Sequence, residues 1–128
     1  MIEHKVLFLH EQIAAYARAS GDMNPIHLDE KFARSVGLPG VIAHGMLQMS
    51  IAAVVAAKAA GDPKRLRKLS CRFAGMVEPG DTVTFAAEET APGRLQIRAV
   101  NQHGDTILTK AYAEFEPGPR TGEEADAS

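Results

Sequence analysis

The sequence predicts an α+β fold in which a curled antiparallel β-sheet wraps around one long, apolar helix. Two observations predict it. Residues 44–60 have apolar side chains on nearly every side, which is typical of a buried helix. From residue 69 onward, apolar and polar residues alternate with a period of two between short turns, as in half-buried antiparallel strands. One buried helix and one antiparallel meander fit an α+β domain.

The sequence of the first third of the chain predicts four short elements. The glycine at position 21 ends the first helix, and Asn24 before Pro25 is pushed away from helical geometry, so a loop follows. Asp29 suits the start of the next helix. In order, we expect a strand at 4–9, a helix at 10–20, an irregular loop at 22–27 and a short helix at 29–35.

The remaining elements are the long helix and the meander. Gly61-Asp-Pro63 ends the helix predicted over 44–60. A single sheet leaves an exposed edge strand and an outer face, and pairing with a second subunit is the usual way to cover them, so we expect a homodimer or a larger or heteromeric assembly. Strands are expected at 69–73, 82–86, 95–100 and 107–115.

Length and composition fit one domain with an ordinary core. The chain has 128 residues, 45% of them hydrophobic, and 14 basic residues against 16 acidic ones, so nucleic-acid binding is not expected. Residues 117–128 lack apolar content and predict a disordered tail after a folded domain at 1–116. The single cysteine, Cys71, excludes an internal disulfide and lies in a strand pattern, which predicts a buried, inert thiol.

The N-terminus lacks the layout of a signal peptide. The longest apolar run, residues 51–57, is far shorter than the roughly 18 residues that a membrane span needs. We therefore expect a cytoplasmic protein without a membrane partner.

Asp22 and His27 are the first candidates for chemistry. A loop can aim both side chains at one point, where an imidazole and a carboxylate together can polarise water and move protons near neutral pH. On spacing alone a structural interpretation is favoured, in which Asp22 accepts loop amides and His27 is an incidental surface residue. A metal site formed by Asp22, His27 and His44 is not expected, because the regular spacing of metal ligands is absent.

The segment Ala43-His-Gly-Met46 is the second candidate. Amides at a helix N-terminus favour negative charge, and Gly45 would let a substrate oxygen approach the backbone. On spacing alone, His44 and Gly45 merely shape the turn into the helix. The basic run Lys64-Arg-Leu-Arg-Lys68 is interpreted as a solvated connection, with a landing site for the phosphates of a substrate carrier as the alternative.

Three segments together resemble the MaoC-like dehydratases, the family of (R)-specific enoyl-CoA hydratases (hydratase 2). Residues 16–29, with Ser20-Gly-Asp-Met-Asn-Pro-Ile-His27, resemble the hydratase 2 motif. Ile-Ala-His-Gly-Met-Leu at 42–47 resembles the second family signature. Cys-Arg-Phe at 71–73, followed by Val-Glu-Pro-Gly-Asp at 77–81, is similar to the strand and turn after the central helix. The resemblance spans residues 9–115.

The resemblance implies a hot-dog fold, paired subunits and the reversible syn addition of water to a trans-2-enoyl thioester. It implies that Asp22 and His27 are catalytic, that Asn24 and His44 support them, and that the Gly45 amide binds the thioester carbonyl. No cofactor is implied beyond the coenzyme A or acyl carrier protein that bears the substrate. The acyl chain would lie against the long helix, with Met46, Met49 and Ala53 as pocket candidates.

Three alternatives stay open. The substrate could be a (3R)-hydroxyacyl group on the acyl carrier protein of a type II fatty acid or polyketide pathway. The chain could be a non-catalytic partner in a heteromeric hot-dog complex, although such a subunit would be expected to lack the acid–base pair. Thioesterase activity is disfavoured because residues 44–60 contain no acidic residue.

Overall fold

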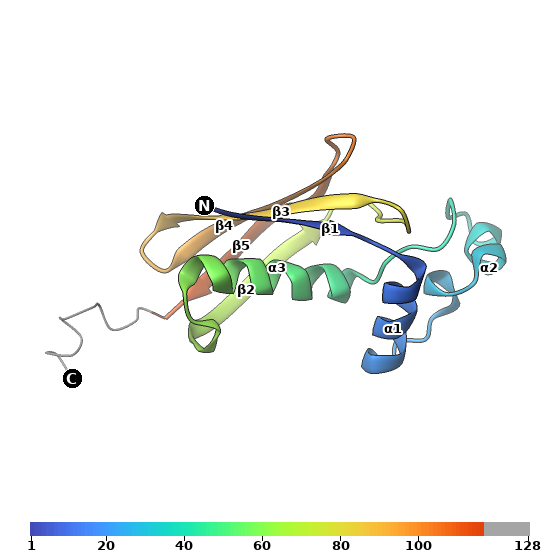
Figure 1. Cartoon of the computed structure of the whole chain (residues 1–128), viewed down its shortest axis with the longest axis horizontal. Coiled ribbons are helices and arrows are strands. Elements are labelled where there is room, and N and C mark those ends of the chain that lie inside the picture. Colours follow the sequence, from blue (N-terminus) through green and yellow to red (C-terminus); the bar gives the residue numbers. More distant parts are fainter. Residues whose placement is uncertain (117–128) are drawn as a thin grey trace, which may run out of the picture.

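The computed structural model describes residues 1–116, which form one five-stranded sheet and a central helix that lies along its face (Figure 1). The predicted α+β fold, with a sheet curled around a long helix, is confirmed. The elements in chain order are β1 (Ile2–Leu7), α1 (His10–Ser20), the 3-10 helix η1 (Pro25–His27), α2 (Glu30–Ser35), α3 (Gly45–Ala60), the 3-10 helix η2 (Pro63–Arg65), β2 (Leu66–Phe73), β3 (Thr82–Ala91), β4 (Arg94–Asn101) and β5 (Thr106–Phe115).

The sheet has the strand order β1-β3-β4-β5-β2, and every neighbouring pair is antiparallel. Tight turns connect β3 to β4 and β4 to β5, so the meander predicted from the alternating pattern is present. The first strand and the strand after α3 occupy the two edges of the sheet. These two edges therefore present backbone groups that no neighbouring strand of the described chain pairs.

The core lies between α3 and the inner face of the sheet. Helix α3 packs mainly against β3. Ala52, Val55 and Ala56 of the helix are almost fully buried, as are Val83 and Phe85 of the strand. Two of these three helix residues are alanines, so small side chains line the helix side of the core.

One expectation for α3 is wrong in the single chain. The helix is not buried on all sides: Met46 is 61% exposed and Val54 is 53% exposed. The sheet covers one face of the helix, and the described part of this chain leaves the opposite face open. An apolar helix face without cover is typical of a contact surface.

Several element boundaries also differ from the prediction. β1 spans Ile2–Leu7 rather than 4–9, β2 begins at Leu66 rather than at residue 69, and β3 continues to Ala91 rather than ending at residue 86. The longer β2 arises because Leu66 pairs with Phe115 at the far end of β5, a contact that the local pattern does not show. The tail predicted at 117–128 lies outside the described residues. Within residues 1–116, no helix is long and apolar enough to cross a membrane.

Candidate active site

The predicted catalytic residues come together where the loop after α1 meets the start of α3, at one end of the molecule (Figure 1). His27 Nε2 lies 3.9 Å from Asp22 Oδ2. The ring of His44 stacks on that of His27, with 3.7 Å between the ring centroids and an interplanar angle of 22°. Three residues singled out in two separate sequence segments thus form one cluster.

The geometry of the loop follows from its Asn-Pro sequence. Asn24 Oδ1 accepts a hydrogen bond from the Ile26 amide at 3.1 Å, which caps the single turn of η1. The main-chain amide of Asn24 donates to Asp22 Oδ1 at 3.3 Å, and Oδ2 is the carboxylate oxygen that faces His27. This turn places Asp22 and His27 on the same side of the loop. The carboxylate of Asp22 is 54% exposed, whereas the side chain of His27 is 8% exposed.

His27 is held in one orientation by the segment before α3. Its Nδ1 lies 2.7 Å from the carbonyl oxygen of Ile42, and the Ile42 amide donates to the Ile26 carbonyl at 3.2 Å. A carbonyl only accepts, so Nδ1 bears a hydrogen, and in the neutral ring Nε2 keeps a lone pair that faces Asp22. His27 is therefore not the incidental surface residue of the structural interpretation.

Gly45 opens α3, where the first amides of a helix have no partner within the helix. The structure gives a further reason for a glycine here. A Cβ at this position would lie 3.0 Å from Cζ of Phe73, because the Phe73 ring rests on the Cα of Gly45. Phe73 comes from the end of β2 and is 50% exposed. The sequence indicated close approach of a substrate oxygen and missed this ring, since no local signal links residues 45 and 73.

The donor atoms of Asp22, His27 and His44 lie within 4.8 Å of one another, so a metal ion has to be considered. The geometry argues against a three-ligand site. Lone pairs of imidazole nitrogens lie in the ring plane, and the planes of the two stacked rings are 22° from parallel, so the lone pairs do not converge on one ion. The arrangement suits a site for water and protons better.

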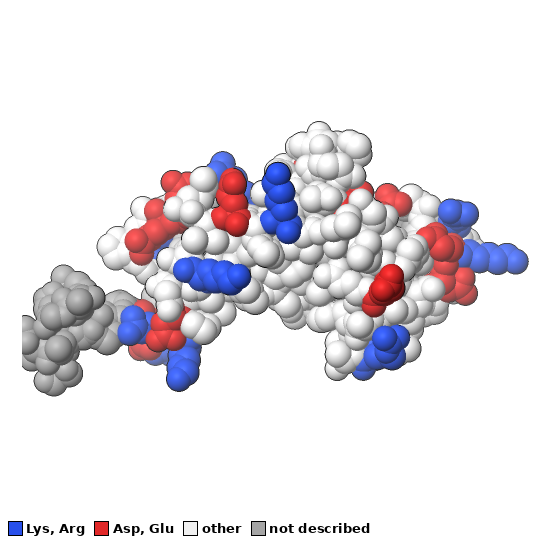
Figure 2. Space-filling view, in the orientation of Figure 1, with Lys and Arg blue, Asp and Glu red and all other residues white. Residues whose placement is uncertain are grey.

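An apolar groove with a volume of about 480 Å³ runs beside the second half of α3. Ala53, one of the three acyl-pocket candidates, lines it. Met46 and Met49 lie nearer the start of the helix, outside this lining. Figure 2 shows a broad uncharged surface over the middle of this face of the molecule.

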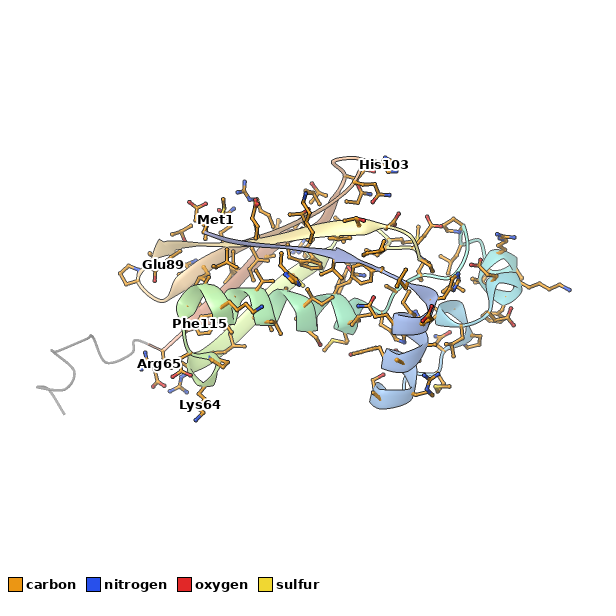
Figure 3. The ribbon with its side chains drawn as sticks, in the orientation of Figure 1. Met1, Lys64, Arg65, Glu89, His103 and Phe115 are labelled. Carbon is orange, nitrogen blue, oxygen red and sulfur yellow. The ribbon has the colours of Figure 1, made fainter. Side chains whose placement is uncertain are left out.

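The basic run at 64–68 lies at the end of the molecule away from α1, where Lys64 and Arg65 point outward (Figure 3). Much of its charge is locally balanced: Arg65 pairs with Asp62 at 3.3 Å and Arg67 pairs with Glu116. Cys71 of β2 is partly rather than fully buried. Its partial burial raises the pKa of the thiol, which favours the protonated form near neutral pH.

Comparison with known proteins connects this geometry to a family. Residues 2–111 match the family model described as the MaoC like domain. The chain is 30% identical over 110 residues to a probable enoyl-CoA hydratase 2 of Dictyostelium discoideum, covering 84% of this chain and 37% of that protein. It is 39% identical over 109 residues to the fatty acid synthase subunit beta of Aspergillus oryzae, covering 80% of this chain and 5% of that subunit.

Solved structures of (R)-hydratases resemble this chain in fold. The R-hydratase PhaJ1 of Pseudomonas aeruginosa superposes with a TM-score of 0.74 and 26% identity, covering 90% of this chain and 79% of the hydratase. The (R)-hydratase of A. caviae involved in PHA biosynthesis gives a TM-score of 0.72 and 27% identity, covering 89% and 92%. The chain is a member of the MaoC-like dehydratase family, and it has the hot-dog fold of the (R)-hydratases.

Proposed function

We propose that the protein is a hydro-lyase that adds water reversibly to the double bond of a trans-2-enoyl thioester and forms the (3R)-hydroxyacyl thioester. One observation carries the proposal. His27 Nε2, which carries the lone pair in the neutral ring, faces the Asp22 carboxylate across 3.9 Å at the N-terminal end of α3. The names of the similar enoyl-CoA hydratase 2 and (R)-hydratases support the same reaction class.

The gap between His27 and Asp22 fits one water molecule. A water that hydrogen-bonds to both atoms at roughly 2.8 Å closes such a triangle without strain. In the proposed step, the oxygen of this water forms the bond to C3 while one of its O–H bonds breaks toward the acid–base pair. The pair returns one proton to C2 on the same face of the substrate. Atoms balance as the addition of one H₂O, and no redox change occurs.

The Gly45 amide is proposed to bind the thioester carbonyl. As C3 is attacked, electron density moves through the conjugated system onto that oxygen, and an unpaired amide at a helix N-terminus stabilises it. The acyl chain would continue along the exposed face of α3 past Met46 and Met49 toward the groove lined by Ala53. No cofactor is required for this chemistry.

A second candidate is dehydration of a (3R)-hydroxyacyl group on an acyl carrier protein. The similarity to fatty acid synthase beta subunits favours it, and both candidates use the same bonds and the same residues. A non-catalytic partner role is disfavoured, because Asp22 and His27 are both present at a distance that suits catalysis. We further propose that the working unit is a homodimer, since β2 is an open sheet edge beside the uncovered face of α3.

The test follows the loss of ultraviolet absorbance of the conjugated enoyl thioester, with crotonyl-CoA and a medium-chain analogue as substrates. We expect hydration by the wild type and a decrease in kcat of roughly a hundredfold or more in both Asp22→Asn and His27→Ala. Folded wild type that hydrates neither ester, but dehydrates a hydroxyacyl carrier protein, would select the second candidate. Equal activity in all three proteins would overturn the assignment of the site.

A further inference from the structure

His44 is the most buried member of the cluster, and the acid–base step proposed above makes no use of it. Its side chain is 1% exposed. One face of its ring lies on His27, and Tyr16 of α1 meets it edge-on with 4.9 Å between the ring centroids. Such a ring cannot turn without displacing both neighbours.

The nitrogens of His44 have unequal environments. Nε2 lies 3.1 Å from the main-chain carbonyl oxygen of Asp22, and because a carbonyl only accepts, Nε2 bears the hydrogen. Nδ1 is fully buried and has no hydrogen-bond partner in the described part of the chain. A proton on Nδ1 would place a buried charge without a partner next to the ring of His27, which is costly. The geometry of His44 therefore favours the ring form that bears its hydrogen on Nε2.

The two stacked imidazole rings thus bear their hydrogens on different nitrogens. His27 bears its hydrogen on Nδ1, toward Ile42, and offers Nε2 to the site. His44 bears its hydrogen on Nε2, toward Asp22, and buries Nδ1. His44 contacts both members of the catalytic pair, one through a hydrogen bond to the main chain and one through a ring face.

We propose that His44 is the positioning residue of this site: its Nε2–H fixes the main chain at Asp22 while its ring fixes His27, so that His44 sets the gap between carboxylate and imidazole. The proposal rests on the proposed function and adds a role to it. The carboxylate of Asp22 is half exposed on a loop, and its own hydrogen bond to the Asn24 amide lies within that loop. The bond from His44 ties the loop to the start of α3, 22 residues away.

The gap matters for rate more than for binding. A displacement of about 1 Å in a catalytic group can cost roughly a hundredfold in rate. Loss of the His44 anchor should therefore lower kcat and leave KM nearly unchanged, because the residues proposed to hold the thioester lie on α3. If His44 served only to pack the core, its loss would lower the stability of the fold without lowering kcat selectively over KM.

Three substitutions separate the functions of the side chain. Glutamine can present an N–H near the position of Nε2, phenylalanine keeps the ring without a donor, and asparagine is too short to reach the Asp22 carbonyl. We expect His44→Gln to keep at least about a third of kcat. His44→Phe and His44→Asn should lose roughly tenfold to a hundredfold, with KM within about twofold of wild type. Equal kcat in the Gln and Asn variants would overturn the proposal.

A second measurement needs no variant. Nitrogen-15 NMR of the wild-type chain near neutral pH reports which nitrogen of each histidine bears hydrogen. We expect the Nε2–H form for His44 and the Nδ1–H form for His27. A cationic His44, or hydrogen on its Nδ1 alone, would overturn the proposal. The NMR result does not depend on turnover. An inactive wild type would count against the proposed hydratase function, and the tautomer of His44 would still test its positioning role.

Discussion

Single residues in the catalytic loop act mainly through their hydrogen bonds. The side-chain oxygen of Asn24 accepts a hydrogen bond from the Ile26 amide, and the main-chain amide of Asn24 donates to the Asp22 carboxylate. These two hydrogen bonds shape the whole turn. His27 depends on a carbonyl 15 residues away for its orientation. The catalytic side chains themselves are thus held by groups that take no part in proton transfer.

Asn24→Ala should lower both stability and turnover. Loss of the cap costs about 1 kcal/mol of unfolding free energy, and a looser turn should reduce kcat by roughly tenfold. Asp29→Ala is the matched control, because Asp29 caps α2 with an equivalent hydrogen bond to the Phe32 amide at 3.1 Å, outside the site. Urea unfolding and hydration assays should show similar stability losses in the two variants but a kcat loss mainly in Asn24→Ala. Equal kcat losses would contradict the role of the Asn24 turn.

At the scale of the elements, Gly45 of α3 and Gly93 between β3 and β4 are glycines for different structural reasons. Gly45 has no left-handed backbone, and its constraint is the half-exposed ring of Phe73. Gly93, in the turn between β3 and β4, has a φ of +76°, and a Cβ there would lie 2.6 Å from the carbonyl oxygen of Phe115. A flexible ring can shift, whereas a paired backbone cannot.

The same glycine-to-alanine change should therefore have opposite effects at these two positions. Gly45→Ala should change unfolding free energy by less than about 1 kcal/mol, and lower kcat/KM by at least about tenfold because the displaced ring and the new methyl crowd the carbonyl site. Gly93→Ala should cost at least about 2 kcal/mol and leave the kcat of the folded fraction near wild type. Chemical denaturation and steady-state kinetics check both, and the reverse pattern would exclude Gly45 from the site.

On the scale of the whole molecule, the open face of α3 is an unpartnered surface of the described residues. It exposes Met46 and Val54, and Phe73 of the edge strand β2 and Met76 after it are exposed as well. Apolar surface of this kind next to an open sheet edge is typical of a subunit contact.

Val54→Asp should weaken the proposed dimer, because it places a charge in an apolar contact. The dimer dissociation constant should rise by roughly tenfold or more. Gln96→Asp adds the same charge on the exposed outer face of the sheet and should leave assembly unchanged. Light scattering coupled to size-exclusion chromatography distinguishes the two. A wild type that is monomeric at all concentrations would contradict the proposed assembly.

Local patterns in the sequence determined much of this protein. The change from a helical to a two-residue period gave α3 and the meander, and the Asn-Pro turn marked the loop that holds Asp22 and His27. Periodicity and turn chemistry reflect interactions between neighbours in the chain, so they can be read from the residues alone. The resemblance of three segments to the MaoC-like dehydratases added the family, which the match over residues 2–111 confirmed.

Only the tertiary structure decided how the site is held. The Ile42 carbonyl fixes His27, His44 reaches the Asp22 carbonyl, and Phe73 rests on Gly45. The open face of α3 is also a tertiary result, because the sequence shows that the helix is apolar but not which side the sheet covers. These contacts join residues that are distant in the chain, and they depend on how the sheet curls around the helix. The curvature of the sheet results from many weak packing interactions across the whole fold, so no local sequence pattern specifies it.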